Sequence, residues 1–379
     1  MLPLFYVISH YSNLPFRAWE QRKFIEIINR LSKTSNSSIL PKVEYEDIIA
    51  EEGRLNKDIS NKFDSRKGIL FQPKNILYGK LRPYLKNWLY PDFKGVAVGD
   101  FWVFEAIEAT PRFIYNLIQS DSYQKVANDT AGTKMPRSDW TKVSNSSFFI
   151  PKESSEQKRI GTFFKQLDDT IALHQRKLDT LKQMKKGLLQ QMFPKSEEDV
   201  PKIRFADFDE EWYQRKLGEE FEKINERNDG SFGKTHWISV AKMYFVEPNK
   251  VLSNNIDTRT YVMRKGDIAF EGHSNTDFKF GRFVANDIGP GIVSELFPVY
   301  RHKTNYDNNY WKNAIQLEHI MAPIYSKSIT SSGNSSNKLD SKHFLNQKIY
   351  IADFEEQEKI GSIFKQLDNT IILYQNKLN

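Results

Sequence analysis

The sequence predicts a mixed α/β (α+β) protein of two globular units joined by two long helices. The helices are expected to pair as an antiparallel coiled coil, with pseudo-twofold symmetry between the halves. Residues 156–179 and 356–379 are copies of one segment, set 200 positions apart with 15 of 24 residues identical. Each copy carries a heptad stripe, and short strand-like and helical runs lie between the copies. The chain is therefore a duplicated unit.

The composition allows a sizeable core, since 39% of the 379 residues are hydrophobic and 13% are aromatic. The absence of cysteine excludes disulfides and cysteine-bound zinc. No apolar run approaches the roughly 18 residues that span a bilayer, and the opening MLPLFYVIS lacks the basic region of a signal peptide. We therefore expect a cytoplasmic protein without a membrane partner. The formal net charge of +7 favours a polyanionic partner.

The first long helix is expected over residues 154–193, after Pro151 and before Pro194. Its seam follows alternating steps of four and three residues: Ile160, Phe164, Leu167, Ile171, His174 and Leu178. The second copy repeats these steps with Ile360, Phe364, Leu367, Ile371, Tyr374 and Leu378. The other copy is the nearest partner for such a stripe, and packing of each helix on its own unit alone is the alternative.

The starts of the helices carry capping patterns, Ser154 with Gln157 and Asp353 with Glu356. Gly161 and Gly361 occupy the same position in the two copies. Because glycine inside a helix costs about 1 kcal/mol, this position predicts a close approach between helices.

The second copy stops at residue 379, whereas the first continues to Pro194. We therefore expect a shortened second helix. Four apolar residues of the continuation are expected to lack a partner within the chain or to be covered by another subunit: Leu181, Leu188, Leu189 and Met192.

The sequence between the copies predicts strands at 68–71, 96–104, 268–270 and 291–299. Helical spacing appears at 111–128 and 308–321, linker-like sequence at 195–202, and a long polar loop at 327–342. Each globular unit contains a segment outside the repeated helix, which we call its filling. The borders of the two fillings are also repeated: WEQRKF at 19–24 aligns with WYQRKL at 212–217, and Gly132 and Asp139 align with Gly333 and Asp340. Similarity between these borders is poor, which indicates that each filling recognises something different.

Catalytic motifs are missing from the sequence. It contains no GxxxxGK[ST] phosphate loop, no HExxH zinc motif and no Asn/Asp-Pro-Pro-aromatic motif of an amino-methyltransferase. The seven histidines are scattered, and His174 takes the seam position of Tyr374. We therefore expect a non-catalytic chain without a metal site.

Residues 66–94 carry the clearest binding signal. Seven basic residues interleave there with six aromatic residues, against Asp92 as the one acidic residue. Basic side chains neutralise phosphates and can reach base edges, so the segment favours nucleic acid. The alternative is a basic surface over a hydrophobic strand.

The arrangement resembles the specificity subunit of Type I restriction–modification enzymes. Typical of that family are the two repeated helix segments, GKLRPYL at 79–85 and PKIRFADFDEEW at 201–212, whereas SNLPFRAW near the N-terminus matches the latter only partly. The resemblance implies target-recognition domains at 1–152 and 195–352, each reading one half of a split DNA site. It implies spacer helices at 153–194 and 353–379, the second one shortened.

The resemblance also implies the partners: double-stranded DNA, two methyltransferase subunits docked on the helices, and two translocase-nuclease subunits. S-adenosylmethionine, ATP and Mg are then expected on the partner subunits and no cofactor on this chain. The alternative function is a stand-alone sequence-specific DNA-binding protein or repressor without enzymatic partners.

The residues that read DNA carry no fixed family motif, so they are chosen here from their chemistry. In the first unit the DNA-binding candidates are Lys74, Tyr78, Lys80, Arg82, Lys86, Lys134 and Arg137. In the second unit they are His273, Asn275, Lys279, Arg282, Asn334 and Lys338.

Overall fold

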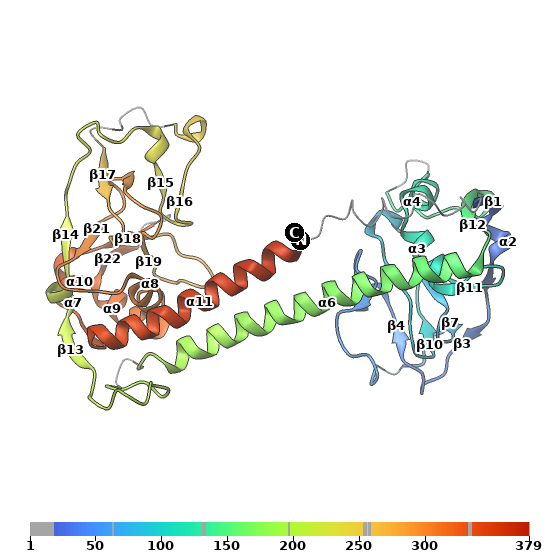
Figure 1. Ribbon diagram of the computed structural model, residues 1–379, viewed down its shortest axis with the longest axis horizontal. Helices are drawn as coiled ribbons and strands as arrows, with labels where there is room; N and C mark the ends of the chain where they lie inside the picture. The colour runs from blue at the N-terminus through green and yellow to red at the C-terminus, as the bar shows by residue number, and fades with distance from the viewer. Residues whose placement is uncertain are drawn as a thin grey trace. The chain divides into compact units, whose positions relative to one another are not determined.

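The computed structural model describes residues 19–378, except 63, 131–133, 196–197, 253–255, 257–258 and 333–335 (Figure 1). The chain divides into two compact units, unit 1 (Met1–Ile171) and unit 2 (Ala172–Asn379). The boundary falls inside the long helix α6 (Ser154–Gln191), so each unit includes part of that helix. The finer domain limits expected from the sequence stay a prediction.

Unit 1 is built around a four-stranded antiparallel sheet of order β2-β11-β8-β9. Its strands are β2 (Ile28–Leu31), β8 (Ile76–Gly79), β9 (Trp88–Leu89) and β11 (Phe101–Ala106). Successive residues of a strand point to opposite faces, and both faces are buried here. Ile76 and Tyr78 join one core cluster, whereas Leu77 joins another.

Helices cover one face of this sheet and a second sheet covers the other. The helices are α3 (Pro111–Gln119), α4 (Asp121–Ala127) and α5 (Trp140–Asn145). The second sheet has the order β3-β7-β10-β4, with β3 (Thr34–Ser35), β4 (Lys42–Val43), β7 (Gly68–Phe71) and β10 (Gly95–Ala97). The small strands β5 (Ile48–Ile49) and β6 (Arg54–Leu55) pair beside the short helix η1 (Tyr45–Asp47).

Unit 2 repeats this plan. Its main sheet has the order β14-β21-β18-β19, with β14 (Phe221–Ile224), β18 (Ile268–Glu271), β19 (Arg282–Ala285) and β21 (Val299–His302). The helices α8 (Asn308–Ala314), α9 (Glu318–Ser328) and α10 (Ser341–Leu345) take the places of α3, α4 and α5. Two strand pairs cover the other face: β15 (Ile238–Ser239) with β16 (Tyr244–Phe245), and β17 (Thr260–Met263) with β20 (Gly291–Ser294).

The first and last strands of each unit pair with each other in matching registers. In unit 1, β1 (Trp19–Lys23) pairs with β12 (Ser147–Pro151) and Arg22 lies opposite Phe148. In unit 2, β13 (Tyr213–Lys216) pairs with β24 (Lys348–Ile351) and Arg215 lies opposite Ile349. Short helices follow the first strands, α2 (Phe24–Ile27) and α7 (Leu217–Glu220), and the last strands lead into the long helices. The mixed α/β class and the duplication are thus confirmed.

The structure divides several of the expected elements. The expected strand at 96–104 is two strands, β10 and β11, because Gly99 turns the chain with a φ of +100°. The expected helix at 111–128 is likewise two helices, since Ser120 is extended and its hydroxyl caps α4. The expected strand at 291–299 and the expected helix at 308–321 divide in the same way.

The expected loop at 327–342 was wrong for its described part. Ile329–Ser332 (β22) and Asn337–Leu339 (β23) form an antiparallel hairpin. Ile329 and Leu339 pack against the core of unit 2, and Ser331 and Ser332 pair with Lys338 and Asn337 across the hairpin. A polar composition therefore did not prevent strand pairing.

Within unit 2, the end of α6 lies antiparallel to α11 (Phe354–Leu378) (Figure 1). The ring of His174 packs on Tyr374 with centroids 5.5 Å apart, and Lys185 Nζ lies 2.6 Å from Asp368 Oδ1. The antiparallel pair is thus confirmed over this stretch. No helix in the described part of the chain is long and apolar enough to cross a membrane.

The expectation that the end of α6 lacks an intrachain partner was wrong. Met192 is buried in the core of unit 2, and Leu188 and Leu189 pack against it. The antiparallel direction explains this, because it brings the end of α6 beside the start of α11. Leu181 is half-buried.

Candidate nucleic-acid interface

In unit 1, two loops distant in sequence meet at one end of the main sheet. Leu81, just after β8, forms an antiparallel bridge with Arg137. The backbone N–H of Arg82 donates to Pro136 O at 2.7 Å, and that of Ser138 donates to Lys80 O at 2.9 Å. The structure therefore brings the candidates Lys80, Arg82 and Arg137 together.

Asp100 is shared by two of these cations. Arg137 Nη2 donates to its carboxylate at 3.0 Å, and Lys80 Nζ lies 3.6 Å away. Tyr45 donates its hydroxyl hydrogen to Asp100 O and accepts from Leu81 N–H. Burial raises the pKa of Tyr45, so its hydroxyl stays protonated and can keep donating to Asp100 O. One carboxylate against two cations leaves the group positive, and Arg137 is half-exposed.

The tip of the first loop is a short helical turn, η2 (Pro83–Leu85), between two residues with left-handed backbone. Arg82 has a φ of +49° and Lys86 a φ of +53°. Tyr84, at the tip, is 54% exposed, and Leu85 is 39% exposed. Tyr84 belongs to the candidate surface, although the sequence did not single it out as a DNA-binding candidate. Its place in the RPYL string, between basic residues, was the signal for it.

The remaining candidates of unit 1 divide between surface and core. Lys74 and Lys134 are exposed, whereas Lys86 is half-exposed and lies 3.2 Å from Glu51. Tyr78 is fully buried, stacks on Trp102 and has a pKa raised to about 12 by burial. It is therefore a core residue and does not lie on a DNA-facing surface, because β8 is covered on both faces.

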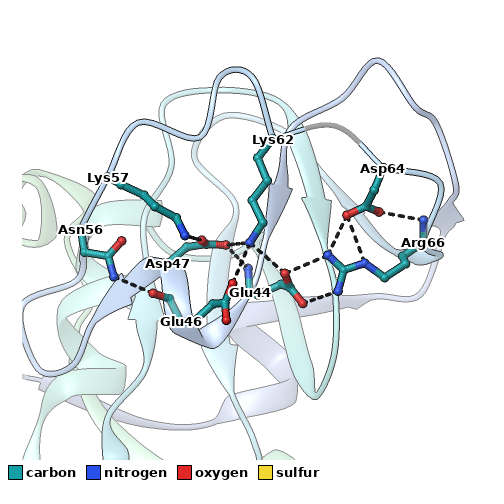
Figure 2. Close-up of polar contacts among 8 residues, drawn as sticks. All are labelled: Glu44, Glu46, Asp47, Asn56, Lys57, Lys62, Asp64 and Arg66. Atoms are coloured by element: carbon teal, nitrogen blue, oxygen red, sulfur yellow. Dashed lines mark hydrogen bonds and ion pairs between the residues drawn. The ribbon is translucent and has the colours of Figure 1, made fainter.

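Arg66, the first residue of the basic segment 66–94, is held in ion pairs and is not a free cation (Figure 2). Arg66 donates to Glu44 at 2.5 and 2.9 Å and to Asp64 at 2.6 Å. Lys62 in turn lies 2.8 Å from Glu44 and 2.7 Å from the buried Asp47. These residues form one ion-pair network with Glu46, Asn56 and Lys57. Arg66 therefore holds the loop together, and its charge is compensated.

In unit 2, the loop after β18 meets the β22–β23 hairpin. Asn337 N–H donates to Gly272 O at 2.9 Å, and a Cβ at Gly272 would lie 2.2 Å from Asn337 O. The hairpin therefore needs glycine at 272. It brings Lys338, which is exposed, toward the loop that holds His273 and Asn275. Asn334 lies outside the described residues, as does Gly132.

The candidates of the 273–282 loop play different parts. His273 Nδ1 contacts Glu271 Oε1, and the His273 side chain is 64% exposed. Asn275 Oδ1 accepts from Asp277 N–H and Phe278 N–H, so this side chain shapes the turn. Lys279 is exposed.

Arg282 links this loop to a neighbouring hairpin. Its guanidinium donates to Ala241 O at 2.6 Å and lies 4.8 Å from the ring centroid of Phe278. The β15–β16 hairpin, with Lys242 and Tyr244 exposed, therefore lies beside the site. These two residues were missed from the sequence, where the string KMYF was the available signal.

The two loop sites occupy equivalent places in the two units. The strand registers align β8 with β18 and β9 with β19, so Lys74 corresponds to Gly266 and Lys86 to Gly281. Lys74 N–H donates to Pro91 O as Gly266 N–H donates to Asn286 O. All four residues have positive φ: +71° and +53° for the lysines, +91° and +81° for the glycines. Unit 1 thus places lysine where unit 2 uses glycine.

The seam residues fall into two groups. Leu178, Ile360 and Phe364 are buried, and Ile160, His174, Leu367, Ile371, Tyr374 and Leu378 are half-buried. Phe164, Leu167 and Ile171 are instead 43%, 45% and 50% exposed. The seam is therefore closed in unit 2, whereas three apolar residues of α6 in unit 1 stay open to solvent.

The described residues contain no group of three or more His, Asp or Glu side chains arranged to hold a metal ion. The site is instead a set of cations, amides and exposed aromatic residues on paired loops. Such a surface can bind phosphates and base edges.

Comparisons with known proteins agree with this picture. The family model described as Type I restriction modification DNA specificity domain matches residues 18–183. A solved chain from work on complex assembly and conformational transition of the type I R-M system is 16% identical, with a TM-score of 0.53 over 97% of this chain and 94% of that one. The S subunit of a Type-I restriction-modification system from M. genitalium is 14% identical, with a TM-score of 0.57 and the same coverage. At these identities the structures show a shared fold. The search of curated proteins finds no match.

Proposed function

We propose that the chain is the DNA-recognition subunit of a Type I restriction–modification system, because the family model of that DNA specificity domain matches residues 18–183. The observation that best supports this proposal is the pair of equivalent loop sites, one in each unit. They lie on equivalent sheets and carry different side chains. Equivalent positions of the two loop sites are consistent with two units that recognise the same duplex. Different side chains suit two different half-sites.

Unit 1 would read its half-site through the loops at 80–86 and 134–138. Lys80, Arg82, Lys86, Lys134 and Arg137 supply the positive charge of these loops, and Lys74 adds a cation at the other end of β8. Phosphate contacts fix the register of a protein on DNA, while contacts to base edges discriminate sequence. Tyr84 at the tip adds an apolar surface for a base edge or a thymine methyl group.

Unit 2 would read the other half-site through its 273–282 loop, with Lys338 and the β15–β16 hairpin beside it. His273, Lys279 and Arg282 supply hydrogen-bond donors, and Asn275 holds the turn that presents them. Each bidentate base contact contributes about 1–3 kcal/mol of discrimination.

The helices would set the gap between the half-sites and dock the partner subunits. The open stripe of Phe164, Leu167 and Ile171 supports docking, because exposed apolar rows on helices mark interaction surfaces. We assign the stripe to a methyltransferase subunit. S-adenosylmethionine, ATP and Mg would belong to the methyltransferase and translocase-nuclease subunits, and this chain would supply recognition without catalysis.

Methylome sequencing of a host with and without this gene tests the function. We expect adenine methylation at a split motif that is present only with the gene. Duplex binding by the purified chain without any gene-dependent methylation would instead favour a stand-alone DNA-binding protein or repressor. Neither methylation nor binding would contradict both functions.

A further inference from the structure

Each long helix carries the same pair as its third and fourth residues, Glu156-Gln157 in α6 and Glu356-Gln357 in α11. The sequence predicts capping boxes at these positions. Asp353 does accept from Glu356 N–H at 2.8 Å. The side chains of the Glu-Gln pairs, however, do not fold back on their own helices. They contact the globular unit to which each helix is attached.

Gln157 joins three elements of unit 1. Its Oε1 accepts from the N–H of Thr110, the residue before α3, at 2.8 Å. Its Nε2 donates to the carbonyl of Pro151, the last residue of β12, at 2.9 Å. The side chain is buried, so both hydrogen bonds are shielded from water.

Gln357 repeats these contacts in unit 2. Its Oε1 accepts from the N–H of Asp307, the residue before α8, at 3.4 Å, and its Nε2 donates to Ala352 O at 2.9 Å. The same amide thus joins the same three elements in both units. This agreement holds although the fillings around it have diverged in sequence.

The neighbouring glutamates bind a tryptophan at the start of each unit, Trp19 in β1 and Trp212 just before β13. Glu156 Oε1 accepts from Trp19 Nε1 at 3.1 Å, and Glu356 Oε2 accepts from Trp212 Nε1 at 3.0 Å. Glu356 is buried and also binds Arg204 through two hydrogen bonds of 2.8 Å. Within the described residues Glu156 has no such arginine.

One turn later, each glycine lies against the helix that the glutamine holds. A Cβ at Gly161 would lie 3.1 Å from the Arg112 side chain, and one at Gly361 would lie 1.9 Å from Asp307 Oδ1. The first two turns of each long helix are therefore fixed to the unit at several points. Such an arrangement restrains the direction of the helix as well as its position.

Direction matters because the helix is long. At about 1.5 Å per residue a helix the length of α6 spans roughly 57 Å. A tilt of roughly 10° at its first turns displaces the far end of the helix by about 10 Å, which is the rise of about three base pairs of DNA. A DNA-recognition unit attached to such a helix therefore needs a rigid contact at the first turns of the helix to keep its register on the duplex.

We propose that Gln157 and Gln357 are positioning residues that set the gap length tolerated between the two half-sites. This inference rests on the proposed function and assigns the residues no contact with DNA. Arg204 adds two hydrogen bonds to Glu356 near the start of α11.

The test uses the full chain with Gln157→Met and Gln357→Met, each of which removes both hydrogen bonds at nearly unchanged volume. Gln166→Met and Gln366→Met are matched controls, because these glutamines are exposed and occupy equivalent positions on the same helices. The probes are duplexes that the unaltered chain selects from a randomised pool. They are compared with versions whose gap is one base pair longer or shorter and with a duplex carrying one half-site.

We expect single half-site affinity to stay within about twofold for all four variants. The preference for the correct gap is expected to fall at least about fivefold in the Gln157 and Gln357 variants only. Gln157→Glu and Gln357→Glu place a buried carboxylate against the carbonyls of Pro151 and Ala352, so they should lose at least as much gap preference as the methionine variants.

An unchanged gap preference in the Gln157 and Gln357 variants would overturn the inference. So would a loss of half-site affinity as large as the loss for the full site, since that pattern indicates a purely structural role. A motif without a gap, selected by the unaltered chain, would overturn the proposed function itself and is thereby distinguished.

Discussion

At the scale of single residues, the informative positions are those where the side chain conflicts with the backbone. Lys74 and Lys86 hold left-handed backbone at places where unit 2 has Gly266 and Gly281. Left-handed backbone costs a non-glycine residue roughly 1–2 kcal/mol. Strained residues cluster at functional sites, so the lysine side chains are the candidates to explain this cost.

Lys74→Gly and Lys86→Gly should therefore separate folding from binding. We expect each variant to melt at or above the temperature of the unaltered chain, because glycine relieves the backbone. Each should also bind duplex DNA more weakly and lower the slope of log Kd against log salt by about 1 for each phosphate that the lysine neutralises. Lys86→Arg is the control that keeps the charge. A full salt slope in the glycine variants would count against a phosphate contact.

The glycines of the long helices give a second contrast. Gly361→Ala places a methyl group against the Asp307 carboxylate that caps α8, so we expect a loss of about 1–2 kcal/mol in unfolding free energy. Gly161→Ala meets Arg112 Cβ and Cγ at 3.1 Å and Phe113 N at 3.5 Å, a tight contact without the overlap at Gly361, and it gains helix propensity. Its loss of unfolding free energy should therefore be smaller than that of Gly361→Ala. Urea unfolding of both variants measures the difference. Equal destabilisation would show that the two contacts are alike.

At the scale of elements, the two ends of helix α6 lie in different environments. Leu188 and Leu189 near its end pack against the core of unit 2, whereas Phe164, Leu167 and Ile171 are open in unit 1. One heptad stripe thus serves as core at one end and as exposed surface at the other. The exposed end is where a partner would bind.

Leu167→Asp tests that assignment. The side chain is 45% exposed, so we expect the melting temperature to stay nearly constant while co-purification with the methyltransferase subunit is lost. Thr162→Asp, on the opposite face of the helix, is the matched control and should still bind. Leu367→Asp, by contrast, should destabilise unit 2, because Leu367 packs against its core. Retained co-purification of Leu167→Asp would remove the stripe from the docking surface.

The ion-pair network of η1 predicts a pH dependence (Figure 2). Hydrogen bonds from Arg66 hold the pKa of Glu44 below its ordinary range. Burial raises the pKa of Asp47, but hydrogen bonds from Lys62 and the Glu44 N–H outweigh this, and its pKa is also lowered. A lowered pKa in the folded state adds stability above the unfolded pKa of about 4, and that stability is lost as the pH falls further.

Melting temperatures between pH 7 and pH 3.5 measure this dependence. Glu44→Gln should lower the melting temperature at pH 7 and flatten its decline toward acid. Glu46→Gln is the control, because the Glu46 side chain is 70% exposed and should leave the curve nearly unchanged. If Glu44→Gln and the unaltered chain lose stability in parallel, the network does not titrate as proposed.

At the scale of the whole molecule, the duplication predicts that the two loop sites act independently on sequence. Arg82→Ala should relax base preference in one half of the selected motif, and His273→Ala in the other, each by about 1–3 kcal/mol at the affected position. Selection from a randomised duplex pool reads both halves at once. A single variant that relaxes both halves would contradict two separate readers.

Much of this architecture was predictable because it rests on periodicity. The repeat and the heptad steps are one-dimensional patterns that local physics converts into helices. Within unit 2 the antiparallel pairing of His174 with Tyr374 and Lys185 with Asp368 agrees with the prediction. The basic segment at 66–94 also pointed to the loop that carries Arg82.

The errors came where a residue's role depends on neighbours distant in sequence. Tyr78 looked like a stacking residue but is core, because a second sheet and a helical layer cover both faces of β8. Arg66 looked like a free cation but is bound by Glu44, 22 positions earlier. Lys242 and Tyr244 were missed, because only the fold sets Ala241 against Arg282.

The amino-acid sequence was sufficient to identify a duplicated α/β chain with two repeated helices and two diverged segments between them. Identity at equal spacing and heptad periodicity are properties of the chain that need no coordinates. The contacts of the buried glutamines Gln157 and Gln357 were found only in the folded chain. Their partners, Thr110 and Pro151 for one glutamine and Asp307 and Ala352 for the other, are backbone groups that no side-chain pattern reveals. Burial and long-range hydrogen bonds exist only once distant segments meet.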